Sequence, residues 1–184
     1  SNQKLRRRYH VADAYDYRQN SIYKTYLACD AVSDEVLLRN HYRCNREIIE
    51  FNNKKYYHSK LKIRTKSTEP QPLVYVNIKS GEIAQKNTSP AEVDEITAYA
   101  QLNRDKSIAV ITPFVNQKML IEQSIKENHL DNLVCGTVHA FQGDEKDVIL
   151  FSTALSDRTY TGTYQWLKSN KELINVATSR ARDR

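Results

Sequence analysis

The sequence predicts a layered α/β domain with a mainly parallel sheet. Three short apolar runs alternate along the chain with three helical patterns: residues 108–111, 133–135 and 148–151 for the strands, and residues 89–100, 116–128 and 169–182 for the helices. Strands that alternate with helices in this way pair in parallel through crossovers, and the helices then cover the sheet. The run at 108–111 is apolar at every position, as in a strand buried on both faces.

Local signals support these elements and add others. Ser89 is a typical helix N-cap, because a proline occupies the first helical position after it and a glutamate the third. Apolar residues that recur on one helical face predict a helix over residues 46–57. Residues 35–38 and 73–78 are predicted as two further strands. Two prolines and several polar residues at 64–72 indicate a loop.

The chain has 184 residues, enough for one domain with a full hydrophobic core. Residues 1–34 are polar and basic and are expected to form a lead-in, so that residues 35–184 form the domain. No apolar run approaches the roughly 18 residues that cross a bilayer. Three widely spaced cysteines fit reduced thiols in an intracellular, cytoplasmic protein, and a net charge of +6 modestly favours a polyanionic partner.

Several kinds of active site are missing from the sequence. The chain has four glycines, and none of them forms the phosphate-binding pattern G-x-x-x-x-G-K-[ST] or the dinucleotide pattern G-x-G-x-x-G. No serine lies in a nucleophile elbow, and no H-E-x-x-H pattern suggests a metal site. A small metabolic enzyme, complete in this chain, is therefore not expected.

Four polar segments nevertheless stand out. They are residues 40–43 before a helix, 112–117 after a buried strand, 137–147 between two strands, and 175–182 in the last helical pattern. The third, T-V-H-A-F-Q-G-D-E-K-D, gathers polar residues that core packing does not require, and loops on a rigid scaffold commonly carry function. Taken alone, this loop is equally well an ordinary connection.

The fourth segment carries an arginine on an apolar face. On a helix over residues 169–182, Arg180 shares one face with Leu173, Val176 and Ala177, whereas Arg182 points nearly opposite. Burial of an unpaired guanidinium is too costly, so Arg180 is predicted to meet a carboxylate or a phosphate. A structural salt bridge is the alternative.

Together the four segments resemble the second motor domain of superfamily 1 helicases, in particular the subgroup with the nonsense-mediated-decay RNA helicase and the replication helicase-nuclease. Tyr42 and Arg43 are similar to its Y-R element, and Thr112 and Pro113, with Gln117, to its I-T-P-Y-x-x-Q element. Residues 137–147 are similar to T-V-[DH]-x-F-Q-G-x-E-x-D, and residues 175–182 to N-V-A-L-T-R-A-R. After the Y-R pair the sequence departs from the subgroup, because Cys-Asn-Arg replaces its common Met-His-Pro.

The resemblance implies a three-layer RecA-like fold of the P-loop NTPase type. Two such domains hold ATP between them, and the other one, expected upstream, supplies the P-loop and the carboxylates that bind Mg²⁺. Arg43 and Arg180 would be the catalytic arginine fingers at the γ-phosphate. The remaining nucleotide contacts would come from Tyr42 on the adenine, Glu145 on a ribose hydroxyl, and Gln142 and Gly143 near the phosphates.

The same resemblance implies single-stranded DNA or RNA as the partner, bound in a sequence-tolerant way by Thr112, Pro113, Thr137 and His139. The chain would thus be the second motor domain of an ATP-dependent helicase, which couples ATP hydrolysis to translocation. Alone it would be inactive, because it lacks the P-loop, and no metal ligands are predicted in it. The alternative is a non-catalytic RecA-like module that binds nucleic acid or regulates. The choice between DNA and RNA stays open.

Overall fold

The computed structural model describes residues 2–29, 36–67, 69–78, 87–141, 145–156 and 159–184. The chain forms two compact units, Ser1–Leu38 and Arg39–Arg184. The domain boundary expected at residues 34 and 35 lies outside the described residues. None of the described helices is long and apolar enough to span a membrane.

The first unit contains helix α1 (Asn2–Arg8), the 3-10 helix η1 (Asp13–Tyr15) and helix α2 (Ile22–Cys29). Arg6 holds it together, because its guanidinium forms ion pairs with Asp13 and Asp16. The lead-in expected from the sequence is therefore helical in part.

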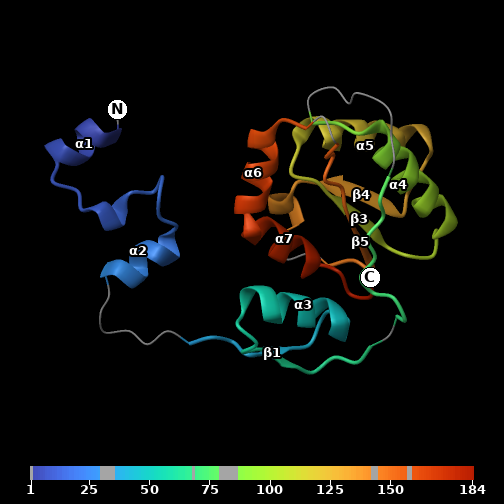
Figure 1. Cartoon of the computed structure of the whole chain (residues 1–184), viewed down its shortest axis with the longest axis horizontal. Coiled ribbons are helices and arrows are strands. Elements are labelled where there is room, and N and C mark those ends of the chain that lie inside the picture. The colour runs from blue at the N-terminus through green and yellow to red at the C-terminus, as the bar shows by residue number, and fades with distance from the viewer. Residues whose placement is uncertain (1, 30–35, 68, 79–86, 142–144, 157–158) are drawn as a thin grey trace. The chain divides into compact units, whose positions relative to one another are not determined.

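The second unit is built on a three-stranded parallel sheet in the order β4-β3-β5 (Figure 1). The strands are β3 (Ile108–Ile111), β4 (Leu133–Gly136) and β5 (Val148–Phe151). Ile108 pairs with Leu133 on one side and with Val148 on the other, so the three strands run in step from a common amino edge. The mainly parallel α/β sheet predicted from the sequence is confirmed.

Helices cover both faces of this sheet (Figure 1). One face packs on α4 (Pro90–Leu102) and α5 (Val115–Glu127), through a core that includes Ile96, Ile121 and Val110. The other face packs on α7 (Lys171–Thr178) and the 3-10 helix η2 (Val138–Phe141). Successive side chains of a strand point to opposite faces, so β3 needs an apolar residue at every position.

A smaller element lies beside the main sheet. Strand β1 (Asn40–His41) pairs in parallel with β2 (Lys62–Ile63), and helix α3 (Arg46–Tyr56) connects them. The buried residues Ile48 and Ile49 of α3 pack with Ala181, Leu61 and Ile63. This core brings α3 to the end of the chain.

The end of the chain runs alongside β5. Ala181 forms a parallel bridge with Lys146, and Ile149 donates its backbone N–H to the carbonyl of Arg184 at 2.8 Å. These bonds hold the segment after α7 against the outer edge of the sheet.

Three predicted elements are wrong in whole or in part. Residues 73–78 form no strand, and residues 36–38 form none either, the short strand being at Asn40–His41 instead. Side chains of both runs are exposed, Tyr75 by 86%, because no neighbouring strand pairs with them. The helix predicted over 169–182 is shorter, α7 (Lys171–Thr178), so Arg180 lies beyond its end, and a helix that was not predicted, α6 (Thr161–Ser169), precedes it.

The helix start at Ser89 is confirmed. Its side chain accepts the N–H of Glu92 at 3.3 Å, and Pro90 begins α4.

Candidate functional site

The loop before α3 is joined to the segment after α7. The Cys44 thiol donates to the carbonyl of Ser179 at 3.4 Å, and the Asn45 N–H donates to the carbonyl of Arg182 at 2.7 Å. Cys44 and Asn45 are buried, so these bonds are shielded from water. Arg43, directly before this pair, is therefore held close to Arg180, 137 positions later in the chain.

A polar seam between α3 and α7 reinforces this junction. Thr178 donates its hydroxyl to Asn52 Oδ1 at 2.8 Å, and Asn175 Nδ2 donates to the Tyr57 hydroxyl at 3.3 Å. Asn52 is fully buried, and its Nδ2 has no hydrogen-bond partner among the residues that the structure describes. The seam fixes the last turn of α7 and hence the start of the segment that carries Arg180.

Three charged groups gather at this junction. Arg43 Nε lies 2.5 Å from Glu145 Oε2, in an ion pair that is partly exposed to solvent. Burial raises the pKa of the Cys44 thiol to about 11, an effect that the positive charges of Arg43 and Arg180 oppose and the carboxylate of Glu145 increases. The charges of Arg43, Glu145 and Arg180 thus all influence the pKa of the buried Cys44 thiol.

Arg180 differs from Arg43 in its partners. Its Nε is buried, and within the described part of the chain this atom has no hydrogen-bond partner. A buried guanidinium N–H without an acceptor is costly, so this atom can donate to an anionic ligand. The structural salt bridge, the alternative for Arg180, is not found at this nitrogen.

His41 orients the loop that carries Arg43. Its Nε2 accepts the backbone N–H of Cys44 at 2.9 Å, which requires a neutral ring. Burial, together with the nearby charge of Arg43, lowers the pKa of His41. The tautomer with hydrogen on Nδ1 therefore predominates at neutral pH.

The 137–147 segment crosses the whole sheet. It leaves the carboxyl end of β4 at Gly136 and enters the amino end of β5 at Val148. At its start, η2 approaches the strand so closely that a Cβ on Gly136 would lie 2.7 Å from Phe141 Cε2. Only glycine avoids this clash, and the buried Phe141 ring fixes this end of the segment.

Asp147 fixes the other end. Its carboxylate accepts the N–H and hydroxyl of Ser107, both at 2.8 Å, and pairs with Arg182. The hydrogen bond from the Ser107 N–H is the main cause that lowers the pKa of Asp147. Neighbouring positive charges lower this pKa further, whereas partial burial opposes the shift. The segment thus has Thr137 at the carboxyl edge of the sheet and Glu145 near its amino edge.

A buried hydrogen-bond network lies at the carboxyl edge. Gln117 bonds to the backbone of Ser89 through both its oxygen, at 2.7 Å, and its nitrogen, at 3.3 Å, and donates to Ser152 at 3.0 Å. Ser152 donates in turn to Glu92 at 2.6 Å. Gln117, part of the second polar segment, therefore ties the starts of α4 and α5 to the end of β5.

Thr112 lies at the same edge but is fully buried. Its hydroxyl accepts the N–H of Phe114 at 3.3 Å, and its own N–H donates to the carbonyl of Gly136 at 3.2 Å. Because Thr112 is buried, its side chain offers no surface in this structure, and the nucleic-acid contact expected for it stays a prediction. Pro113 and Thr137 are half-buried.

Other predicted residues differ in how far the structure describes them. Tyr42 is 72% exposed beside Arg43, with its ring open to solvent. Gln142 and Gly143 lie outside the described residues, as does the side chain of His139. Among the described residues, no group of three or more His, Cys, Asp or Glu side chains could hold a metal ion.

No motif in the sequence singles out the residues that join the site. Cys44 is one of the three cysteines expected to be reduced thiols, and Asn52 lies within the helix predicted over residues 46–57. One signal is available: α3 carries the asparagines Asn52 and Asn53 close to its apolar residues. A buried amide needs a hydrogen-bond partner elsewhere in the fold.

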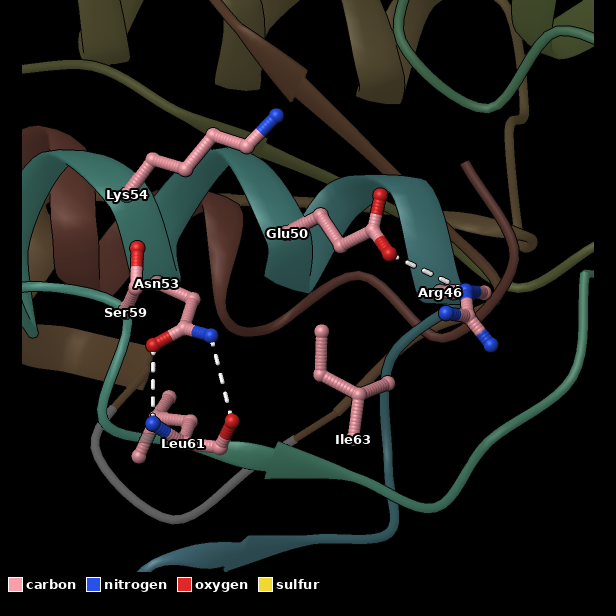
Figure 2. Close-up of a pocket in the computed structure, with 7 residues that line it drawn as sticks. All are labelled: Arg46, Glu50, Asn53, Lys54, Ser59, Leu61 and Ile63. Carbon is pink, nitrogen blue, oxygen red and sulfur yellow. Dashed lines mark hydrogen bonds and ion pairs between the residues drawn. The ribbon is translucent and has the colours of Figure 1, made fainter.

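A pocket of about 330 Å³ lies on the other side of α3 (Figure 2). Three of its polar side chains are engaged: Asn53 bonds both backbone groups of Leu61, at 2.9 and 3.2 Å, and Arg46 pairs with Glu50 at 3.0 Å. None of the predicted site residues lines it. The Asn53 hydrogen bonds hold Leu61, the residue before β2, on α3. The pocket is separate from the junction.

Several helicases are similar to this chain. The human protein "Probable helicase with zinc finger domain" is 24% identical over 162 residues, which cover 78% of this chain and 8% of that protein. "Probable helicase MAGATAMA 3" of Arabidopsis thaliana is 27% identical over 175 residues, 79% of this chain and 21% of that protein. "RNA helicase Mov10l1" of Mus musculus is 30% identical over 128 residues, 59% and 10% respectively.

The chain thus spans between 8 and 21% of the length of these relatives. Their names support the resemblance to helicases that the four polar segments indicated. A family model described as AAA domain (AAA_12) matches residues 18–184, nearly the whole sequence. The chain therefore belongs to this AAA domain family.

Proposed function

We propose that this chain is the second motor domain of an ATP-dependent helicase, where it completes the ATP site and grips single-stranded nucleic acid. The observation that carries the proposal is the junction of Arg43, Glu145 and Arg180, with the unpartnered Nε of Arg180 at its centre. Three segments distant in the sequence meet there, each of them part of the helicase-like pattern. Such a convergence is not needed to pack a core.

The residues of the junction fit a nucleotide. Arg180 has a buried N–H available for a phosphate oxygen, and the guanidinium of Arg43 is close to it. Two positive groups at the γ-phosphate stabilise the charge that develops as the phosphoryl group is transferred. Tyr42, exposed next to Arg43, stacks on the adenine.

The rest of the ATP site belongs to another domain of the full-length protein, upstream in sequence. That domain supplies the P-loop, which this chain lacks, and the carboxylates for Mg²⁺. The 184-residue chain alone therefore hydrolyses no ATP. Turnover by this chain alone, at a rate typical of helicases and abolished by Arg180→Ala, would contradict this division of the site.

The 137–147 segment couples the two ligands in this proposal. Its start, with Thr137, contacts the nucleic acid at the carboxyl edge together with Pro113. Its end, with Glu145, contacts the nucleotide near the amino edge. Phe141 and Asp147 attach the two ends of the segment to the same rigid domain. A movement of the domain at one ligand is therefore transmitted to the other.

The proposal is tested with Arg180→Ala in the full-length protein, by measuring ATP hydrolysis stimulated by single-stranded nucleic acid. Loss of an arginine finger lowers the rate by about 10³-fold or more. Arg46→Ala is the matched control, because Arg46 is a surface arginine that pairs with Glu50 and has no proposed contact with the nucleotide or the nucleic acid. The finger assignment fails if Arg180→Ala stays within a few-fold of wild type.

A further inference from the structure

The two arginines of the junction are held in different ways. Arg180 has a buried, unpartnered Nε, whereas Arg43 has a carboxylate at hydrogen-bond distance from its Nε. The side chains of Arg43 and Glu145 are 38% and 50% exposed, so the pair lies at the surface and can open. Glu145 comes from the 137–147 segment, and Arg43 from the loop before α3.

A triphosphate that approaches Arg43 meets this carboxylate first. Phosphate oxygens and the carboxylate compete for the same guanidinium donors, and the two anions repel each other. An exposed ion pair contributes only about 0–1 kcal/mol, so a multiply charged ligand can displace the carboxylate.

We infer that Glu145 is a positioning residue: it holds Arg43 in the nucleotide-free chain and yields it to the phosphates when a nucleotide binds. The inference rests on the proposed nucleotide half-site and gives Glu145 a role apart from ribose recognition. The carboxylate becomes available to a ribose hydroxyl only after Arg43 has moved to a phosphate. Phosphate binding thereby precedes ribose binding.

Inorganic tripolyphosphate separates the two roles of Glu145, because it carries the charges of ATP but no ribose. Its binding to the 184-residue chain is measured by calorimetry at low ionic strength, where such interactions are least screened. Glu145→Gln removes the competing carboxylate and is expected to tighten tripolyphosphate binding by roughly three- to fivefold. A residue that only binds ribose would leave this affinity unchanged.

The matched control is Glu50→Gln. Glu50 also pairs with an arginine, Arg46, at 3.0 Å on the surface of α3, and its removal changes the net charge by the same amount. It is expected to change tripolyphosphate affinity less than twofold. An equal effect of the two substitutions would reduce the result to general electrostatics and overturn the inference.

The remaining outcomes distinguish the inference from the proposed function. If tripolyphosphate binds and Arg180→Ala abolishes its binding, but Glu145→Gln has no effect, the half-site stands and the role of Glu145 fails. If neither wild type nor Glu145→Gln binds tripolyphosphate, the half-site itself fails and the inference with it. A gain of affinity in Glu145→Gln that disappears in Arg43→Ala/Glu145→Gln supports both.

Discussion

The seam between α3 and α7 gives a prediction whose size follows from the structure. Thr178→Val keeps the shape of the side chain but removes the hydroxyl that donates to Asn52 Oδ1 at 2.8 Å. Asn52 is fully buried and its Nδ2 already lacks a partner, so the substitution leaves the whole amide unsatisfied. A buried polar group without a partner costs about 1–3 kcal/mol, and we expect a loss near 2 kcal/mol.

This loss corresponds to a fall of about 4–8 °C in the unfolding midpoint for a chain of this size. Thermal unfolding can be followed by the fluorescence of Trp166, because the sequence contains one tryptophan. Asn52→Leu on its own removes the same hydrogen bond. Replacing both partners with apolar residues removes the unsatisfied groups, so Asn52→Leu/Thr178→Val should be more stable than the sum of the single effects indicates.

Wild-type stability of Thr178→Val, or strictly additive effects in the double variant, would refute this account of the seam. Thr97→Val is a control for function: Thr97 bonds Ser124 at 2.7 Å between α4 and α5, on the other face of the sheet. It should lower stability without changing ATP hydrolysis by the full-length protein. Thr178→Val should lower kcat as well, because it loosens the support of Arg180.

Three further predictions concern the surroundings of the site. The pKa of His41 is lower in the folded chain than in the unfolded chain, so as the pH falls the unfolded chain is protonated first. The free energy of unfolding should therefore decrease below about pH 6.5. His41→Gln should flatten this pH dependence of the unfolding midpoint. At pH 8 an alkylating reagent should label the exposed Cys29 within minutes. The thiols of Cys44 and Cys135, with pKa values raised to about 11 and 12, should react only when the chain unfolds. Mass spectrometry of the labelled chain measures this difference. Gly136→Ala should lower the unfolding midpoint by several degrees, because the added methyl group meets the buried phenylalanine ring of η2, and an unchanged midpoint would contradict this packing.

The sequence predicted those elements whose signals are local. The apolar run of β3 and the cap at Ser89 each depend on a few adjacent residues, and both were confirmed. The run at 73–78 has equally good β propensity, yet it forms no strand. A strand exists only where a neighbour pairs with it, and that pairing is not encoded within the run itself.

The candidate site was predictable only in part for the same reason. The resemblance to helicases predicts that Arg43, Glu145 and Arg180 belong to one site. Their positions, however, depend on hydrogen bonds between segments more than 130 residues apart. The position of Arg180 beyond the end of α7 also changes the argument for it. Arg180 lies in the segment whose Ala181 bridges Lys146, whereas helical periodicity predicts a place on an apolar helix face.

The buried Nε of Arg180 gives a further test of the proposed anion site. Among the described residues this atom has no acceptor, and a buried polar group without a partner costs about 1–3 kcal/mol. A ligand that binds only the folded state recovers such a cost and stabilises the fold in proportion to the logarithm of its concentration over Kd. An anion bound at Arg180 should therefore raise the unfolding midpoint of wild type but not that of Arg180→Ala. This difference would connect the missing acceptor to a ligand without any measurement of turnover.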